Sequence, residues 1–300
     1  MVADSEGGRL DRFLVHHLSG CSRRQARLAI DAGAVLVNGR PGRKGQAVQS
    51  GDVVCADRTA CAGTLTGQAD LELPILYADA ALIAVDKPAG MPTVALRADD
   101  RGTVANYLLA AYPELRGIGA SAFECGLAHR LDTATSGVLV AGRTAEAWRH
   151  LRAQFRRRQI DKLYLAVVAG EVLCPGTLRL PIAHQPRRRR RMCVCRQPEQ
   201  AVNLGARPAI TRYRPLRRLR GATLLAIRIP TGVRHQIRVH LASFGHPLLG
   251  DTLYGDASAA GASPRLLLHA ARLGLAHPID GRRVIVRSQL PADFQAAVPA

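Results

Sequence analysis

Apolar side chains recur with the spacing of an α-helix twice near the start of the chain. Residues 9–14 open the first helical pattern, and the second runs over residues 23–32. Ser22 is placed to be the N-cap of the second helix, with Gln25 closing a capping box, and Gly33 favours the end of that helix. The pattern therefore predicts two consecutive helices.

A strand pattern follows the two helices. Residues 34–37 form a short apolar run that ends at the dipeptide Asn38-Gly39, which is typical of a tight hairpin turn. We expect a return strand near Val48 and a further strand at residues 52–54. Residues 1–57 are thus predicted to form a compact module of two helices and a small sheet.

The remainder of the chain divides into a linker and a larger domain. Residues 58–74 are small and polar and show no period, which is typical of a flexible connection. Beyond it, strands are predicted at residues 81–85, 138–141, 163–168, 223–229 and 284–286, and helices at residues 103–112, 144–157 and 235–244. This mixture predicts an α+β domain over residues 75–300, built on a substantial sheet.

The net charge of the chain predicts the kind of partner that it binds. The chain has 42 lysine and arginine residues against 23 acidic ones, a formal net charge of +19, which favours a polyanionic partner and above all nucleic acid. No apolar run could span a bilayer and no signal-peptide pattern opens the chain, so we expect a cytoplasmic protein without membrane contact. Seven scattered cysteines without a Cys-x-x-Cys pair argue against a disulfide framework and a zinc site.

Two groups of basic residues could bind such a partner. In the N-terminal module, one positive face that grips phosphates without reading sequence is predicted, the alternative being a solvated helix without ligand. Its members are Arg23, Arg24, Arg27, Arg40, Arg43 and Lys44. The second group is the run from Arg187 to Arg191, expected at an exposed loop or hairpin tip, where phosphate contact is favoured over a merely solvated charge run.

The most informative segment is residues 129–137, H-R-L-D-T-A-T-S-G, which sets one carboxylate among a histidine, an arginine and hydroxyls just before an apolar run. The hydroxyls and the glycine favour a tight turn that presents Asp132 outward, and Arg130 can hold a phosphate or the plane of a base. Asp132 is therefore a candidate nucleophile or base. The alternative is a plain turn or helix N-cap aspartate.

A strand places a tyrosine in a second candidate position. Lys162, Tyr164 and Ala166 share one face of the strand predicted over residues 163–168, because side chains alternate along a strand. Tyr164 can thus point into a cleft, the alternative being an ordinary half-buried strand tyrosine.

The last helical pattern contributes arginines. Ile237, Leu241 and Phe244 recur at the spacing of a buried stripe, and Arg234 and Arg238 are expected to share another face one turn apart. A guanidinium there could pair with a carboxylate and keep it ionised, the alternative being a basic face turned to solvent.

Together these segments resemble known families. Residues 9–55 are similar to the S4 RNA-binding module, in the motifs R-L-D, S-R-x-x-A and G-x-V-x-V-N-G. The chain from Arg9 to about Phe294 resembles pseudouridine synthases of the RluA type. The matching motifs are D-K-P-A-G at 86–90, H-R-L-D at 129–132, T-S-G at 135–137, K-L-Y at 162–164, T-G at 231–232, H-Q-I-R-V-H-L at 235–241, G-H-P-L-L-G-D at 245–251, Y-G at 254–255, L-H-A at 268–270 and H-P at 277–278.

The resemblance implies a fold and an activity. It implies a large mixed, mainly antiparallel sheet with a central cleft, and isomerisation of uridine to pseudouridine without cofactor or metal. Asp132 would be the catalytic aspartate, Tyr164 the active-site aromatic and Arg238 the basic partner of Asp132, while Arg130 would fill the gap left by an everted nucleotide. The residues assigned to RNA binding are Arg9, Ser22, Arg23, Arg24, Arg27, Asn38, Lys44, His129, Arg130, Arg187, Arg188, Arg189, Arg234 and His235.

Several choices stay open from the sequence. The substrate is expected to be structured RNA, large-subunit ribosomal RNA by analogy, with transfer RNA as an alternative, and the protein a monomer. Other readings are a catalytically silent RNA-binding or ribosome-assembly protein and a glycosidase that releases a base. The chain also departs from the family pattern: Thr133 and Ala134 replace charged residues, a His-Pro is missing after Gly90, and Val233-Arg234 stands where Arg-Thr or Arg-Ser is common.

Overall fold

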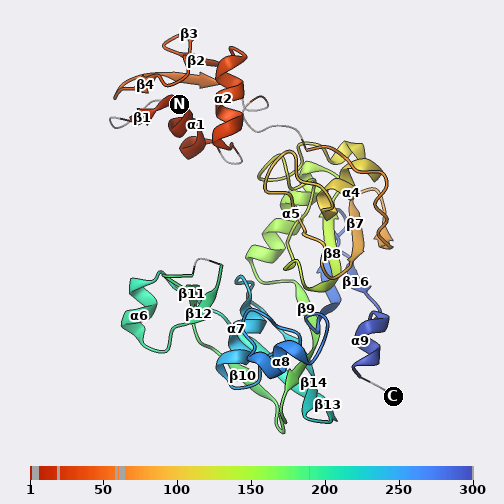
Figure 1. Ribbon diagram of the computed structural model, residues 1–300. Coiled ribbons are helices and arrows are strands. Elements are labelled where there is room, and N and C mark those ends of the chain that lie inside the picture. The colour runs from red at the N-terminus through yellow and green to blue at the C-terminus, as the bar shows by residue number, and fades with distance from the viewer. Residues whose placement is uncertain (2–6, 19–20, 58–59, 61–64, 189, 299–300) are drawn as a thin grey trace. The chain divides into compact units, whose positions relative to one another are not determined.

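The computed structural model describes residues 1, 7–18, 21–57, 60, 65–188 and 190–298 of the 300-residue chain (Figure 1). They form two compact units, one of Met1–Glu72 with Val94–Leu127 and one of Leu73–Thr93 with Ala128–Ala300. Within these described ranges, no helix has the length and apolar character needed to cross a membrane. Part of the predicted linker, residues 58–59 and 61–64, lies outside the described residues.

Helices α1 (Leu10–His17) and α2 (Arg23–Asp31) confirm the two predicted N-terminal helices. The capping box is present, because the Gln25 N–H donates to the Ser22 hydroxyl at 3.2 Å and the Ser22 N–H donates to Gln25 Oε1 at 2.8 Å. Apolar residues from both helices and the small sheet form a buried core. This unit also contains α4 (Val104–Ala111) and the short helix η1 (Pro113–Leu115).

The small sheet corrects one strand prediction. Strand β2 (Val35–Val37) turns at Asn38 and Gly39, both of which have positive φ, and returns at once as β3 (Arg40–Pro41). A strand is present near Val48 as predicted, but it is not the return strand of this hairpin, since the two-residue turn leads directly into β3. Instead β4 (Ala47–Val48) pairs with β1 (Gly7–Arg9), and β5 (Val54–Ala56) pairs with the free edge of β2.

A nine-stranded sheet is the centre of the second unit (Figure 1). Its order is β10 (Gly176–Leu178), β13 (Thr211–Leu219), β14 (Ala222–Arg228), β9 (Asp161–Ala169), β15 (Leu268–Ala276), β8 (Ser136–Gly142), β7 (Leu82–Lys87) and β6 (Ile75–Ala78), with β16 (Arg283–Arg287) also paired to β15. Every pairing is antiparallel except that of β8 with β15. The predicted mixed, mainly antiparallel sheet is confirmed.

Helices cover this sheet on both faces. Helix α5 (Ala145–Arg156) buries Leu151 against β8, β15 and β16, whereas α9 (Ala292–Ala296) buries Phe294 against the opposite face of β9 and β14. The other helices are α6 (Pro198–Asn203), α7 (Gln236–Ser243) and α8 (Ala257–Gly261), and a separate hairpin joins β11 (Ile182–His184) to β12 (Met192–Val194). Helix α7 and this hairpin contribute residues to the polar site that contains Asp132.

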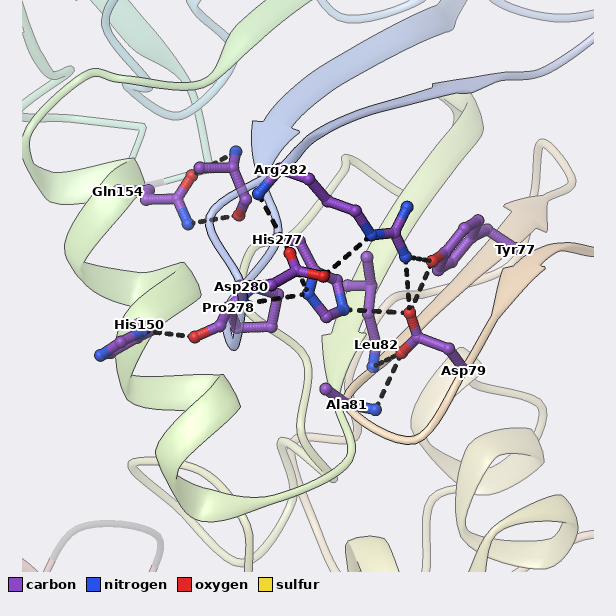
Figure 2. A network of polar contacts seen from close by, with 11 residues as sticks. Tyr77, Asp79, Ala81, Leu82, His150, Gln154, His277, Pro278, Asp280 and Arg282 are labelled. Carbon is purple, nitrogen blue, oxygen red and sulfur yellow. Dashed lines mark hydrogen bonds and ion pairs between the residues drawn. The ribbon is translucent and has the colours of Figure 1, made fainter.

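A polar network joins the β6–β7 turn to the β15–β16 turn (Figure 2). His277 contacts Asp79 through Nε2 at 3.0 Å and Asp280 through Nδ1 at 2.9 Å, and Arg282 donates to the Tyr77 hydroxyl at 2.6 Å. Burial opposes ionisation of Asp79, but hydrogen bonds from Tyr77 and two backbone N–H groups lower the pKa of Asp79 to about 2. The network therefore fastens two turns that are almost two hundred residues apart in sequence.

His129 has a packing role next to β8. Its ring stacks on Phe155 of α5 with the centroids 4.6 Å apart, and its Nε2 accepts the Val140 N–H at 3.2 Å. Burial, aided by the charges of Lys162 and Arg152, lowers the pKa of His129 to about 3. An accepting nitrogen carries no proton, so the fold holds the neutral ring.

Gly137 allows β8 to lie against β15. It is paired with Ala270 of β15, its φ is +114°, and a Cβ atom there would lie 2.3 Å from the Ala270 carbonyl oxygen. No side chain fits at that distance. The strand that follows Asp132 is therefore fixed by a glycine.

Replacing Gly137 tests whether the close approach of β8 and β15 requires a glycine. Gly137→Ala is expected to lower the free energy of unfolding by about 2–4 kcal/mol, because the new Cβ forces the two strands apart. Gly221→Ala is the control, since Gly221 also has a positive φ (+68°) but has open space around it. It should cost only about 1 kcal/mol. Urea unfolding measures both, and equal losses would contradict close approach as the cause.

The neutral His129 predicts a pH dependence of stability. Below the usual histidine pKa of 6.5, His129 binds a proton in the unfolded chain but not in the folded chain. The free energy of unfolding therefore falls as the pH drops from 6.5 toward about 3. This residue contributes at most about 1.4 kcal/mol per pH unit. His129→Gln should show a shallower loss in urea unfolding, while His16→Gln, at an exposed site, keeps the wild-type slope. A wild-type slope in His129→Gln would refute the assignment.

Candidate active site

Asp132 lies on a firmly held turn before β8. The Thr135 N–H donates to the Asp132 carbonyl at 3.0 Å, and the Thr93 hydroxyl accepts the Leu131 N–H at 3.2 Å and donates to the Leu131 carbonyl at 2.8 Å. The Asp132 side chain is 24% exposed. A strand follows the turn, which excludes the helix N-cap interpretation. The backbone is fixed while the carboxylate stays accessible.

Lys87 supports the turn from within the fold. It is fully buried, and its Nζ donates to the carbonyls of Pro88 at 2.8 Å, Met91 at 2.7 Å and Thr133 at 3.0 Å. Three acceptors match the three N–H groups of an ammonium. Burial lowers the pKa of Lys87 to about 7, and the negative charge of Asp132 opposes that decrease. Lys87 was noticed in the sequence only as part of a motif, without a role.

Arg238 reaches Asp132 from helix α7. Its Nη1 lies 3.6 Å from Asp132 Oδ2, while Nε and Nη2 form a two-pronged contact with Asp251 at 2.8 and 2.6 Å. Asp251, which sequence reasoning did not identify, is thus the main partner of Arg238. The predicted face shared with Arg234 is wrong, because the helix begins at Gln236 and Arg234 is exposed before it.

His235 approaches the other carboxylate oxygen. Its Nε2 lies 3.9 Å from Asp132 Oδ1, and its Nδ1 lies 2.8 Å from the Tyr254 hydroxyl. Its φ of +54° is unusual for a residue with a side chain and directs the ring from the start of α7. Burial lowers the pKa of His235, although the charge of Asp132 opposes it. Its neutral form is therefore favoured.

Tyr254 links this centre to the arginine-rich hairpin. Its hydroxyl oxygen accepts the Met192 N–H at 2.7 Å, from the first residue of β12. Its ring is contacted by two guanidinium groups, with the centroid 5.4 Å from that of Arg191 and 5.3 Å from that of Arg238. The sequence showed Tyr254 only as part of a motif.

Tyr164 lies on β9 with its side chain on the face of the sheet that α7 covers. It is 8% exposed, and within the described part of the chain its hydroxyl has no hydrogen-bonding partner. Burial and the nearby charge of Asp132 raise the pKa of Tyr164, so the phenol stays neutral. Lys162, two residues earlier, donates from Nζ to the Thr231 carbonyl at 3.0 Å.

The remaining residues assigned to RNA binding divide into exposed and half-buried ones. Arg130 is exposed beside Asp132, and Arg187 and Arg188 are exposed at the tip of the β11–β12 hairpin, as predicted; Arg189 lies outside the described residues. His129 is half-buried, with its ring stacked on Phe155 and hydrogen-bonded to Val140, and its assignment to RNA binding stays a prediction.

In the N-terminal unit the assigned basic residues are all exposed, and several of them have acidic partners. Arg23 and Arg24 are exposed. Asp11, which is buried, binds Arg9 at 3.0 Å and Arg27 at 3.2 Å, and Lys44 lies 3.6 Å from Asp31.

Two polar side chains of this unit are also assigned to RNA binding. Ser22 caps α2, and the Asn38 carboxamide donates to Asp52 at 2.7 Å and accepts the Val53 N–H at 2.8 Å. Both side chains thus have partners within the fold, and their assignment to RNA binding stays a prediction.

Comparisons with known proteins agree with this arrangement. A family model described as RNA pseudouridylate synthase matches residues 81–243, and an S4 domain model matches residues 8–54. An RNA pseudouridine synthase of Chloroflexus aurantiacus is 40% identical over 287 residues, covering 96% of this chain and 88% of the relative. The ribosomal large subunit pseudouridine synthase D of Nitrosomonas europaea is 36% identical and covers 100% of this chain and 86% of the relative.

Solved structures point the same way. Human RNA pseudouridylate synthase domain containing 1 has a TM-score of 0.59 and 26% identity, covering 73% of this chain and 84% of that one. Human RNA pseudouridylate synthase domain containing 4 has a TM-score of 0.57 and 26% identity, covering 75% and 91%. The family model spans the Asp132 turn, β9 and α7. The chain therefore belongs to the RNA pseudouridine synthases of the RluA type, which are isomerases, and carries an S4 domain at its N-terminus.

Proposed function

We propose that this protein converts specific uridines of large-subunit ribosomal RNA into pseudouridine, with Asp132 as the catalytic carboxylate. The observation that carries the proposal is one accessible carboxylate faced by Arg238 at 3.6 Å and His235 at 3.9 Å, on a turn held by Lys87. The choice of ribosomal RNA is supported by relatives named for the large ribosomal subunit. Ribosomal RNA also fits a cytoplasmic location.

The reaction needs a carboxylate and no external reagent. The bond from N1 to C1′ breaks, the uracil turns, C5 bonds to C1′, and the proton lost from C5 is balanced by one gained at N1. Asp132 either attacks as a nucleophile or removes the C2′ proton to give a glycal, roles that carboxylates take at glycosidic bonds. Arg238 places a positive charge 3.6 Å from the Asp132 carboxylate that both routes require.

Two neighbours of Asp132 suit a flipped-out nucleotide. Tyr164 offers a neutral phenol whose ring can stack on uracil and whose hydroxyl is free to bond with it. Arg130, exposed beside Asp132, can occupy the space that the uridine leaves in the RNA. Everting a base costs about a few kcal/mol and least where the RNA is irregular, so loops of folded RNA are the expected targets.

His235 and Tyr254 are proposed as positioning residues for Asp132. The Tyr254 oxygen accepts the Met192 N–H, so its own proton is free to be donated to His235 Nδ1. A neutral His235 then carries its proton on Nε2, the nitrogen that faces Asp132. Because Met192 follows the arginine run, RNA contact at Arg187 and Arg188 is coupled to the orientation of the carboxylate.

If Asp132 is the catalytic carboxylate, replacing it should abolish pseudouridine formation without weakening RNA binding. Asp132→Asn should abolish pseudouridine formation while RNA affinity stays near that of the wild type, because the amide keeps the shape but cannot attack or accept a proton. Glu146→Gln, an exposed change of the same kind, is the control. Mapping pseudouridines in RNA from deletion cells carrying each variant tests this. Full restoration by Asp132→Asn would mean that another group does the chemistry, and no missing site in the deletion strain would favour a silent RNA-binding protein.

The role of Tyr254 predicts a change in rate and in pH profile. Tyr254→Phe keeps the ring contacts with the two guanidinium groups but removes the donor to His235, so kcat should fall about tenfold with KM for RNA unchanged. Without that hydrogen bond the neutral imidazole is less favoured, the pKa of His235 rises, and the acid limb of the profile should move to higher pH. Tyr213→Phe, a buried tyrosine of β13, is the control. An unmoved acid limb would show that the hydroxyl only packs.

A further inference from the structure

Four arginines form a transverse row across the large sheet, and we call them the arginine row: Arg212 of β13, Arg228 of β14, Arg272 of β15 and Arg287 of β16. Arg212 lies directly opposite Arg228, and Arg272 lies directly opposite Arg287. Leu163 of β9 joins the two pairs, because it is opposite Arg228 on one side and Arg272 on the other. The row therefore crosses five adjacent strands, of which β13, β14, β9 and β16 are labelled in Figure 1.

The arginine row lies on the face of the sheet opposite to the candidate active site. Residues directly opposite in neighbouring strands share a face, and consecutive residues alternate. Leu163 marks the face of the row, so Tyr164, the next residue, lies on the other face with Ile227. Phe294 of α9 packs on the same face as the row but further along, near Val167.

The charges of the row are largely uncompensated. Arg212, Arg228 and Arg287 are exposed, and among the described residues none of them has an ion pair. Only Arg272 has an acidic partner, Asp161 at 2.6 Å. Like charges directly opposite in a sheet destabilise it, so two such pairs cost folding free energy unless an anion lies over them. The arrangement is therefore typical of a surface that binds a polyanion.

The spacing and the composition of this face favour a nucleic acid backbone over an acidic protein. Strands lie about 4.8 Å apart, so the row extends about 19 Å, a length that spans several phosphates of one strand. Leu163, the apolar member of the row, is half-buried, and Ile285, two residues before Arg287, is 42% exposed on the same face. Exposed arginines outnumber this aliphatic side chain, whereas the cores of protein interfaces are depleted of charge and rich in apolar anchors. Arg214, exposed two residues from Arg212, adds a further charge on the same face.

We propose that the arginine row binds the phosphate backbone of a second segment of the same RNA whose uridine is held at Asp132. The proposal rests on the proposed function for the identity of the RNA. Because the two surfaces are on opposite faces of one sheet, the same few nucleotides cannot occupy both. The protein thus recognises an RNA fold that passes around the sheet, and a single hairpin uses only the Asp132 face.

The double variant Arg212→Ser/Arg228→Ser in the full chain tests the row. Its affinity for a full-length large-subunit ribosomal RNA transcript should fall about tenfold, and the slope of log affinity against log salt should decrease by about 1.4–1.8, the value for two lost phosphate contacts. Its affinity for a short hairpin cut from the same transcript should stay at the wild-type value. Its stability to urea should equal or exceed that of the wild type, because like charges have been removed.

The matched control is Arg149→Ser/Arg156→Ser, which removes the same charge from exposed positions of α5. Equal losses of affinity in the two double variants, or an unchanged affinity and slope in the row variant, would overturn the proposal. A selective loss in the row variant supports it. The two proposals can fail separately. If the wild type forms no pseudouridine in any transcript, the proposed function is wrong. If the row variant nevertheless binds the long RNA more weakly than the wild type does, the arginine row is still an RNA-binding surface.

Discussion

The two-pronged contact between Arg238 and Asp251 is the constraint on which the rest of the site depends. Asp251 is fully buried, and its Oδ1 also accepts the N–H groups of Leu253 and Tyr254 at 2.9 and 3.1 Å. One carboxylate therefore fixes helix α7 and the loop that carries Tyr254 at the same time. Arg238 then presents its remaining nitrogen to Asp132, and Tyr254 is held where it meets His235. A guanidinium is suited to this task because its fork can satisfy one partner fully and still face a second.

This arrangement also balances charge around the carboxylates. A single guanidinium cannot neutralise both Asp251 and Asp132, and buried charges need compensation. Lys87 adds a second basic group next to the Asp132 turn, where three carbonyls orient it. Backbone and charge are thus fixed by buried groups, while the Asp132 carboxylate itself, the proposed catalytic group, remains the accessible part. Such preorganisation lets a charged group act without reorganising its surroundings during the reaction.

Local patterns made most of the fold predictable, whereas long-range partners made part of the site unpredictable. The capping box at Ser22, the turn at Asn38 and all five strands proposed in the larger domain follow from short-range rules. Strand β13 was missed because arginines occupy its exposed positions, and β15 because polar residues interrupt it. Asp251 and Tyr254 were missed as partners because only tertiary contacts bring them to α7. Phe244, expected on the buried stripe, is 45% exposed because α7 ends there.

The departure at Val233 shows how one substitution fits the whole arrangement. Val233 is 8% exposed and packs in an apolar cluster with Ile182, Met192 and Val239, so it joins the β11–β12 hairpin to helix α7. A basic side chain at this position would bury a charge among apolar groups, at a cost of about several kcal/mol. Positive charge is instead exposed at Arg234 and along the hairpin tip. The apolar contact thus fixes the hairpin to the helix that carries Arg238, and any anion bound by the tip acts on a surface rigidly connected to Asp132.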